Sequence, residues 1–88
     1  MKRYYIVYEG IVQGVGFRWT MMNLARSLGL TGYVRNLYNG NVEVEVQGEQ
    51  VDAFLKGSLV NDGFIQIYDY AIKEKELIED EKEFTVRF

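Results

Sequence analysis

The chain has 88 residues, of which 48% are hydrophobic and 15% aromatic. This length fits a single domain, and the composition supplies a core and excludes a disordered chain. No apolar run reaches the roughly 20 residues of a membrane span, and the first residues lack the apolar stretch of a signal peptide. We therefore expect one domain over residues 1–88, located in the cytoplasm.

The sequence contains no Cys and no His. Their absence excludes a thiol nucleophile, a disulfide framework, a Ser-His-Asp relay and zinc sites built from Cys and His, although a carboxylate site for Mg²⁺ stays compatible. The net charge of −3 divides into +4 over residues 1–40 and −7 over residues 41–88. An acidic chain is a poor general binder of nucleic acid, so the basic first half better suits a local site for a small anion.

The first third of the chain predicts a strand, a loop and a helix. Residues 4–9 are β-branched and aromatic, which is typical of a strand, and three glycines between Gly10 and Gly16 predict a loop. From Phe17 the apolar residues follow helical spacing, and Gly29 ends that helix. Its apolar face comprises Phe17, Met21, Leu24, Ala25 and Leu28, and Asn23, Arg26 and Ser27 point away.

A hairpin follows the first helix. Residues 31–38 and 41–47 predict two strands, and the Asn39-Gly40 pair between them is a strong hairpin signal, since both residues tolerate a positive φ. In the second strand, valines alternate with polar residues, so we expect one buried face and one solvated face. The buried set is Val42, Val44 and Val46, and the solvated set is Glu43, Glu45 and Gln47.

The second half predicts a helix and two more strands. Residues 49–60 predict the helix, residues 61–63 a turn and residues 64–72 a strand. Residues 73–83 are rich in charge and predict a solvated extension or loop. The inward side chains are Val51, Phe54, Leu55 and Leu59 in the helix, and Phe84, Val86 and Phe88 alternate in a short closing strand.

The predicted order is strand, helix, strand, strand, helix, strand, with one final short strand. This order predicts an α+β ferredoxin-like sandwich, a mainly antiparallel sheet with two helices on one face. The same architecture supports many unrelated functions, so function has to be inferred from individual residues.

The loop that joins the first strand to the first helix is a candidate anion site. The start of a helix has unpaired backbone N–H groups and a positive dipole end, both of which favour an anion. Arg18 in the first turn opposes that dipole, which makes sense if an anion lies between its side chain and the loop. The simpler interpretation is a tight turn with a solvated Arg18. Trp19 replaces the third glycine of a dinucleotide motif and no Lys-Ser or Lys-Thr follows, which excludes both nucleotide loops.

Asn36 is the second candidate, because asparagine is disfavoured within strands. The simpler interpretation is that it begins a long hairpin turn. The functional interpretation is an amide whose oxygen accepts a hydrogen bond from a water and whose nitrogen donates to a substrate oxygen.

Two segments resemble the signature segments of acylphosphatases. The first is Gly10-Ile-Val-Gln-Gly-Val-Gly-Phe-Arg18, and the second runs from Gly32-Tyr-Val-Arg-Asn36 to Gly40, Val42 and Gly48. Both match without a gap, at the expected separation, over about half of the chain. The length, the element order and the closing Phe-Thr-Val-Arg segment are similar too. One departure is that Gly63 precedes Phe64, where family members usually carry Gly-Pro.

The resemblance implies that the protein hydrolyses acyl phosphates to a carboxylate and inorganic phosphate, with no metal and no other cofactor. It implies that Asn36 orients the attacking water and that a phosphate oxygen of the substrate is the base. We expect a monomer that acts on a small acyl phosphate and binds neither nucleic acid nor membrane. The implied phosphate site comprises the Arg18 guanidinium and the backbone amides of Gln13, Gly14, Val15, Gly16, Phe17 and Arg18.

Several alternatives stay open. The same loop would suit an anion-binding or regulatory module without turnover, and the physiological acyl phosphate is not identified. Trp19 and Met22 either lie near the site or pack, and residues 79–81 form a solvated acidic cluster rather than a metal site. Single-stranded RNA binding through sheet tyrosines is disfavoured by the acidic balance. Those tyrosines are Tyr4, Tyr5, Tyr8, Tyr33 and Tyr38.

Overall fold

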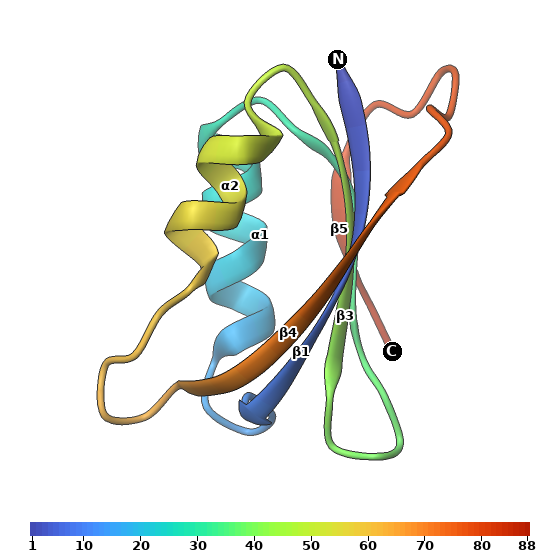
Figure 1. Cartoon of the computed structure of the whole chain (residues 1–88). Coiled ribbons are helices and arrows are strands. Elements are labelled where there is room, and N and C mark those ends of the chain that lie inside the picture. Colours follow the sequence, from blue (N-terminus) through green and yellow to red (C-terminus); the bar gives the residue numbers. More distant parts are fainter.

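The computed structural model describes all 88 residues. Its five strands form one sheet in the order β4-β1-β3-β2-β5, and only the β2–β5 pair is parallel. Figure 1 shows both helices on one face of this sheet, which confirms the ferredoxin-like α+β fold. The elements are β1 (Lys2–Ile11), α1 (Phe17–Ser27), β2 (Thr31–Asn36), β3 (Val42–Gly48), α2 (Val51–Ser58), β4 (Gln66–Lys75) and β5 (Phe84–Arg87).

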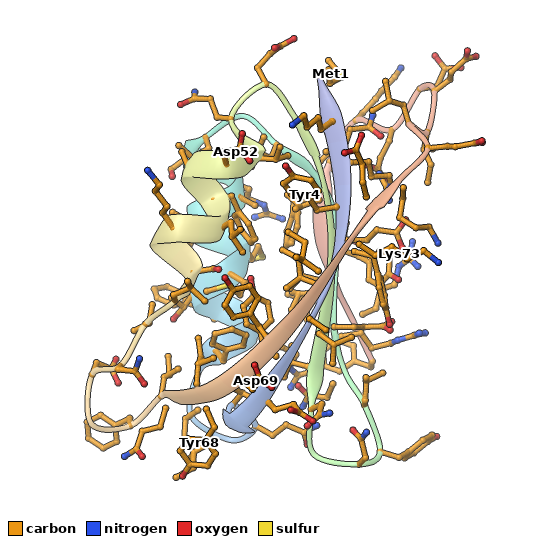
Figure 2. All side chains as sticks on the ribbon, viewed as in Figure 1. Met1, Tyr4, Asp52, Tyr68, Asp69 and Lys73 are labelled. Carbon is orange, nitrogen blue, oxygen red and sulfur yellow. The ribbon has the colours of Figure 1, made fainter.

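The hydrophobic core lies between the sheet and the helices. Its residues come from alternate positions of the central strands β1 and β3 and from one face of each helix, as period-2 and helical spacing predict. Figure 2 shows Tyr4 on this inner side, pointing toward Asp52 at the start of α2, and Lys73 on the opposite side of the sheet. Fully buried members include Ile6, Val42, Val44, Val46, Phe17, Met21, Ala25, Val51 and Phe54.

The polar side chains of β3 are not solvated, contrary to expectation. Glu43 is 4% exposed and Gln47 is 8% exposed, because long side chains of the neighbouring strands cover them. Tyr5 of β1 donates to Glu43 Oε1 at 2.6 Å, and Arg3 Nε donates to Glu45 Oε1 at 2.7 Å. The alternation assigned each residue to the correct face, but neighbouring strands decide how wet that face is.

The C-terminal end of α2 also differs from expectation. The helix ends at Ser58, and Leu59 has already left the helical conformation and is 37% exposed. Ser58 is buried in its place, with its hydroxyl 2.6 Å from the hydroxyl of Tyr8. Leu59 is therefore not one of the inward residues.

Residues 73–83 are not simply a solvated extension. Residues 73–75 continue β4, and the following segment returns across the outer face of the sheet. There Glu81 accepts two hydrogen bonds from Arg3, at 2.8 and 3.2 Å, and Gln47 bonds both backbone groups of Ile78. Arg3 is only 1% exposed beneath this segment.

The β2–β3 hairpin has a longer turn than the Asn39-Gly40 signal alone suggests. The Gly40 N–H donates to the Leu37 carbonyl oxygen, and the Leu37 N–H donates to the Asn41 carbonyl oxygen. Only Gly40 takes a positive φ, of 93°, whereas the Asn39 side-chain oxygen accepts a hydrogen bond from the Asn41 N–H.

Neither of the two helices has the length and apolar composition needed to span a membrane.

Candidate active site

The loop between β1 and α1 depends on two glycines in left-handed conformations. Gly14 has a φ of 72° and Gly16 a φ of 80°, which other residues rarely adopt. A Cβ atom at either position would meet no atom within 4 Å, so both backbones face open space. Gly16 caps α1 without a side-chain hydrogen bond, and the first turn carries no acidic residue. The N–H groups at this helix start are therefore left for a ligand.

This loop borders a cavity of about 340 Å³. Its polar lining comprises Gly14, Gly16 and Arg18 from the loop and the helix start and Asn36 from the end of β2. Its apolar lining comprises Val12 and Phe17, Trp19 from α1, and Val86 and Phe88 from the C-terminal strand and its end. In Figure 1 the β1–α1 loop, the β2–β3 turn and the C-terminus lie toward the same end of the sheet.

Arg18 brings a positive charge to the cavity without a protein carboxylate to neutralise it. No acidic side chain lies within ion-pair distance of it. Its guanidinium carbon lies 5.0 Å from the centre of the Phe88 ring, a cation–π contact that leaves the N–H donors of the fork unpaired. A planar fork of this kind suits two oxygens of one phosphate group.

Asn36 brings an unpaired acceptor to the same cavity. It is the last residue of β2, where its backbone lies opposite Val42, and its side chain lines the cavity. The side-chain oxygen Oδ1 is buried and has no hydrogen-bond partner in the protein. Because a buried acceptor without a donor costs about 1–3 kcal/mol, this atom is suited to a donor that arrives with the substrate or as water.

Gln13 and Val15 do not line the cavity. The side-chain amide Nε2 of Gln13 donates to the carbonyl oxygens of Leu37 and Asn41, at 2.7 and 2.8 Å. It thereby ties the loop to the β2–β3 turn. Val15 packs against the hydrophobic core. Of the site residues named from the sequence, the structure gathers Gly14, Gly16, Phe17, Arg18 and Asn36 around one cavity.

Three apolar residues of the cavity were missed in the sequence, namely Val12, Val86 and Phe88. The alternation of Phe84, Val86 and Phe88 gave a usable signal. Because β5 runs parallel to β2, its last residues reach the end of the sheet where Asn36 lies. Of the two residues left open, Trp19 lines the cavity and Met22 packs against the core.

The tyrosines do not form a shared stacking platform. Tyr8 is buried among core residues, and Tyr4 donates to Asp52 on the helical side of the sheet. On the outer face the hydrogen bond to Glu43 raises the pKa of Tyr5 to about 12. Burial, with Glu43 and Glu45 nearby, raises the pKa of Tyr33 as well. Their hydroxyls are thus held by carboxylates, an arrangement that disfavours an anionic partner such as RNA.

The acidic segment at residues 79–81 is divided. Glu81 is drawn onto the sheet by the ion pair with Arg3, whereas Glu79 and Asp80 are exposed. No group of three or more acidic side chains in the structure is placed to hold a metal ion.

Comparison with known proteins gives a consistent result. The family model described as Acylphosphatase matches residues 4–86. An acylphosphatase of Clostridium beijerinckii is 39% identical over 90 residues, which cover all of both chains. The crystal structure of acylphosphatase from Bacillus subtilis superimposes with a TM-score of 0.93 over all of both chains, at 29% identity. An acylphosphatase structure from Coxiella burnetii gives a TM-score of 0.87 at 30% identity, covering 98% of this chain and 92% of the other. This chain therefore belongs to the acylphosphatase family.

Proposed function

We propose that this protein hydrolyses the carboxyl-phosphate bond of acyl phosphates, releasing a carboxylate and inorganic phosphate. Membership of the acylphosphatase family supports this reaction. The observation that carries the proposal for this chain is the pairing of two unsatisfied groups in one cavity. These are the Arg18 guanidinium, which has no carboxylate partner, and the buried Asn36 Oδ1, which has no donor.

In the proposed complex, the backbone amides of residues 13–18 and the Arg18 guanidinium hold the phosphoryl oxygens. The open backbone at Gly14 and Gly16 supports this placement, because these residues have no side chain and a Cβ atom at either would meet no atom within 4 Å. The positive end of the α1 dipole adds to the attraction for the anion. Phosphoryl transfer passes through a loose transition state whose charge lies on the oxygens, so donors aimed at those oxygens lower the barrier.

Asn36 then orients the water. Its Oδ1 accepts a hydrogen bond from the water, whose oxygen attacks phosphorus opposite the acyl oxygen. The phosphorus–acyl oxygen bond breaks, the carboxylate leaves, and the proton of the water passes to a phosphate oxygen. The use of a substrate oxygen as base suits a sequence with no His and no Cys. Positioning and charge stabilisation are the contributions that the protein itself makes.

The test is hydrolysis of benzoyl phosphate by the purified protein, followed by ultraviolet absorbance. We expect a rate far above that of spontaneous hydrolysis. We also expect competitive inhibition by inorganic phosphate, because it occupies the same site as the phosphoryl group. If folded protein gives no rate above the spontaneous one, the chain is an anion-binding module and the proposed reaction is wrong.

We also propose that the protein acts as a monomer on this small substrate and binds neither nucleic acid nor membrane. The net charge of −3 supports the lack of nucleic-acid binding. Light scattering after size-exclusion chromatography, retention on immobilised single-stranded RNA and vesicle sedimentation test the three statements separately. The cytoplasmic location expected from the sequence stays a prediction.

A further inference from the structure

We propose that apolar residues lining the cavity bind the acyl group and select acyl phosphates with an uncharged, aromatic or bulky apolar acyl group. Three of them, Trp19, Val86 and Phe88, are called the aromatic wall below, and Val12 and Phe17 complete the apolar lining. The inference rests on the proposed function, because it concerns the part of the substrate that leaves as carboxylate.

The size of the cavity is the first argument. A phosphoryl group has few heavy atoms, and at the ~30 Å³ that a water takes in the liquid, five of them fill no more than about 150 Å³. The cavity measures about 340 Å³. More than half of the cavity volume therefore remains beside a bound phosphoryl group, which leaves room for an acyl group.

Exposure of the wall is the second argument. The Trp19 side chain is 67% exposed and Phe88 is 98% exposed, although both line the cavity. Both rings are exposed to water and line the same cavity. A ligand can therefore bury their apolar area without disturbing the hydrophobic core. Burial of that area against an acyl group is favourable in proportion to the apolar surface removed from water.

Charge is the third argument. Arg18 is the one charged residue that lines the cavity, and in the proposed complex it is engaged by the phosphoryl group. An acyl group that carries a second phosphate or a carboxylate finds no second cation there. Such a group would instead place its charge against apolar rings and lose hydration without compensation. The wall therefore discriminates against anionic acyl groups as well as favouring apolar ones.

The first experiment compares kcat/KM for benzoyl, acetyl and succinyl phosphate. We expect the wild type to prefer benzoyl phosphate to acetyl phosphate at least tenfold, and to use succinyl phosphate least well. Trp19→Ala and Phe88→Ala should each reduce the benzoyl-to-acetyl ratio about tenfold, a loss typical of one apolar contact in a specificity pocket. The inhibition constant of inorganic phosphate should change less than twofold.

Tyr68→Ala is the matched control. Tyr68 is 69% exposed, an exposed fraction similar to that of Trp19. It belongs to β4, at the opposite edge of the sheet from β5. In Figure 2 it points away from the sheet near its lower end. The substrate ratio should not change in this variant. An unchanged ratio in both wall variants overturns the inference. So does a parallel loss for all substrates and for phosphate in Phe88→Ala, which would show that Phe88 only positions Arg18.

A second experiment separates this inference from the proposed reaction. Trp19 is the single tryptophan of the chain, so its fluorescence reports directly on the aromatic wall. We expect phenylphosphonate to shift this emission and to bind at least tenfold more tightly than methylphosphonate. That result in a protein without hydrolytic activity would refute the reaction and uphold the wall. Equal affinities in an active enzyme would uphold the reaction and overturn the wall.

Discussion

The side-chain amide of Gln13 donates a hydrogen bond of 2.7 Å to the carbonyl oxygen of Leu37, the residue that follows Asn36. A second bond from the same nitrogen reaches Asn41 at 2.8 Å. One side chain thus ties the loop proposed to hold the phosphoryl group to the strand end that carries Asn36, the residue proposed to orient the water. We infer that Gln13 is a positioning residue.

Gln13→Ala should lower kcat/KM for benzoyl phosphate about tenfold or more, because the loop and Asn36 lose their fixed spacing. Gln13→Glu should be worse, since an ionised carboxylate cannot donate to two carbonyl oxygens. Steady-state rates measure the effect, and melting temperatures by circular dichroism check folding. Gln50→Ala is the control, because Gln50 is exposed and makes no side-chain cap bond. Normal activity in Gln13→Ala would mean that the two segments keep their spacing without it.

Arg18→Ala should nearly abolish activity, and Arg18→Lys should restore little of it. Arginine offers a planar fork to two phosphate oxygens, whereas lysine is a point charge on a flexible stem. Rates with benzoyl phosphate and inhibition by inorganic phosphate measure both effects. If lysine restores most of kcat/KM, the bidentate contact is wrong and only the charge matters.

Asn36→Ala should lower kcat by about 10²–10³-fold, the usual loss for one preorganised polar group, while phosphate affinity stays nearly unchanged. The loop amides and Arg18 still hold the ground-state complex, so the loss belongs to the transition state. Asn36→Asp should be no better, because it places negative charge beside the phosphoryl group. Paired measurements of kcat and phosphate binding test this, and a joint collapse would show that Asn36 holds the ligand.

Activity should survive an excess of EDTA. The proposed mechanism stabilises the phosphoryl charge with backbone amides and one guanidinium, and it assigns no step to a cation. The rate before and after dialysis against EDTA is the measurement, with added Mg²⁺ as the second arm. A loss that Mg²⁺ reverses would assign the acidic side chains a role that this mechanism does not include.

Glu45→Gln should destabilise the protein at neutral pH by about 1–2 kcal/mol, because it removes a charged hydrogen-bond partner of Arg3. Burial tends to raise the pKa of Glu45, but the hydrogen bond and charge of Arg3 outweigh it, and the pKa falls below the usual 4.5. The carboxylate therefore stabilises the fold above pH 4.5, and this contribution disappears as the pH falls through the lowered pKa. Urea unfolding at pH 7 and pH 3 should show a smaller difference between variant and wild type at pH 3 than at pH 7.

The sequence predicted the helices and strands and the sheet face of each side chain well, but it predicted poorly how far neighbouring elements bury those side chains. Alternation placed Glu43 and Glu45 on the outer face correctly, yet their burial depends on Arg3, Tyr5 and Arg35 from adjacent strands. The prediction that Leu59 points inward is wrong for a local reason, because the helix ends one residue before it. Periodicity describes one segment at a time, whereas the burial of a side chain depends on several neighbouring segments.

For the candidate site, too, the sequence identified some residues and missed others. The glycine loop, Arg18 and Asn36 were identified from two contiguous motifs, whose local chemistry is visible in the chain. The aromatic wall and the Gln13 bonds were not, because they join residues that only the sheet order brings together. Phe88 meets Arg18 only because β5 pairs with β2, and Gln13 of the β1–α1 loop reaches Asn41 in the β2–β3 turn.

The strand order also has a kinetic consequence. Apart from the β2–β3 hairpin, each pair of neighbouring strands joins distant parts of the chain, the nearest partners being Tyr8 and Val42. The central strand β1 waits for β4, which runs to Lys75, before both of its edges are paired. Closing such long loops costs entropy before contacts return it, so we expect refolding to be slower than that of helical bundles. The cavity, lined by the β1–α1 loop, the start of α1, the end of β2 and the end of β5, is assembled only when that search is complete.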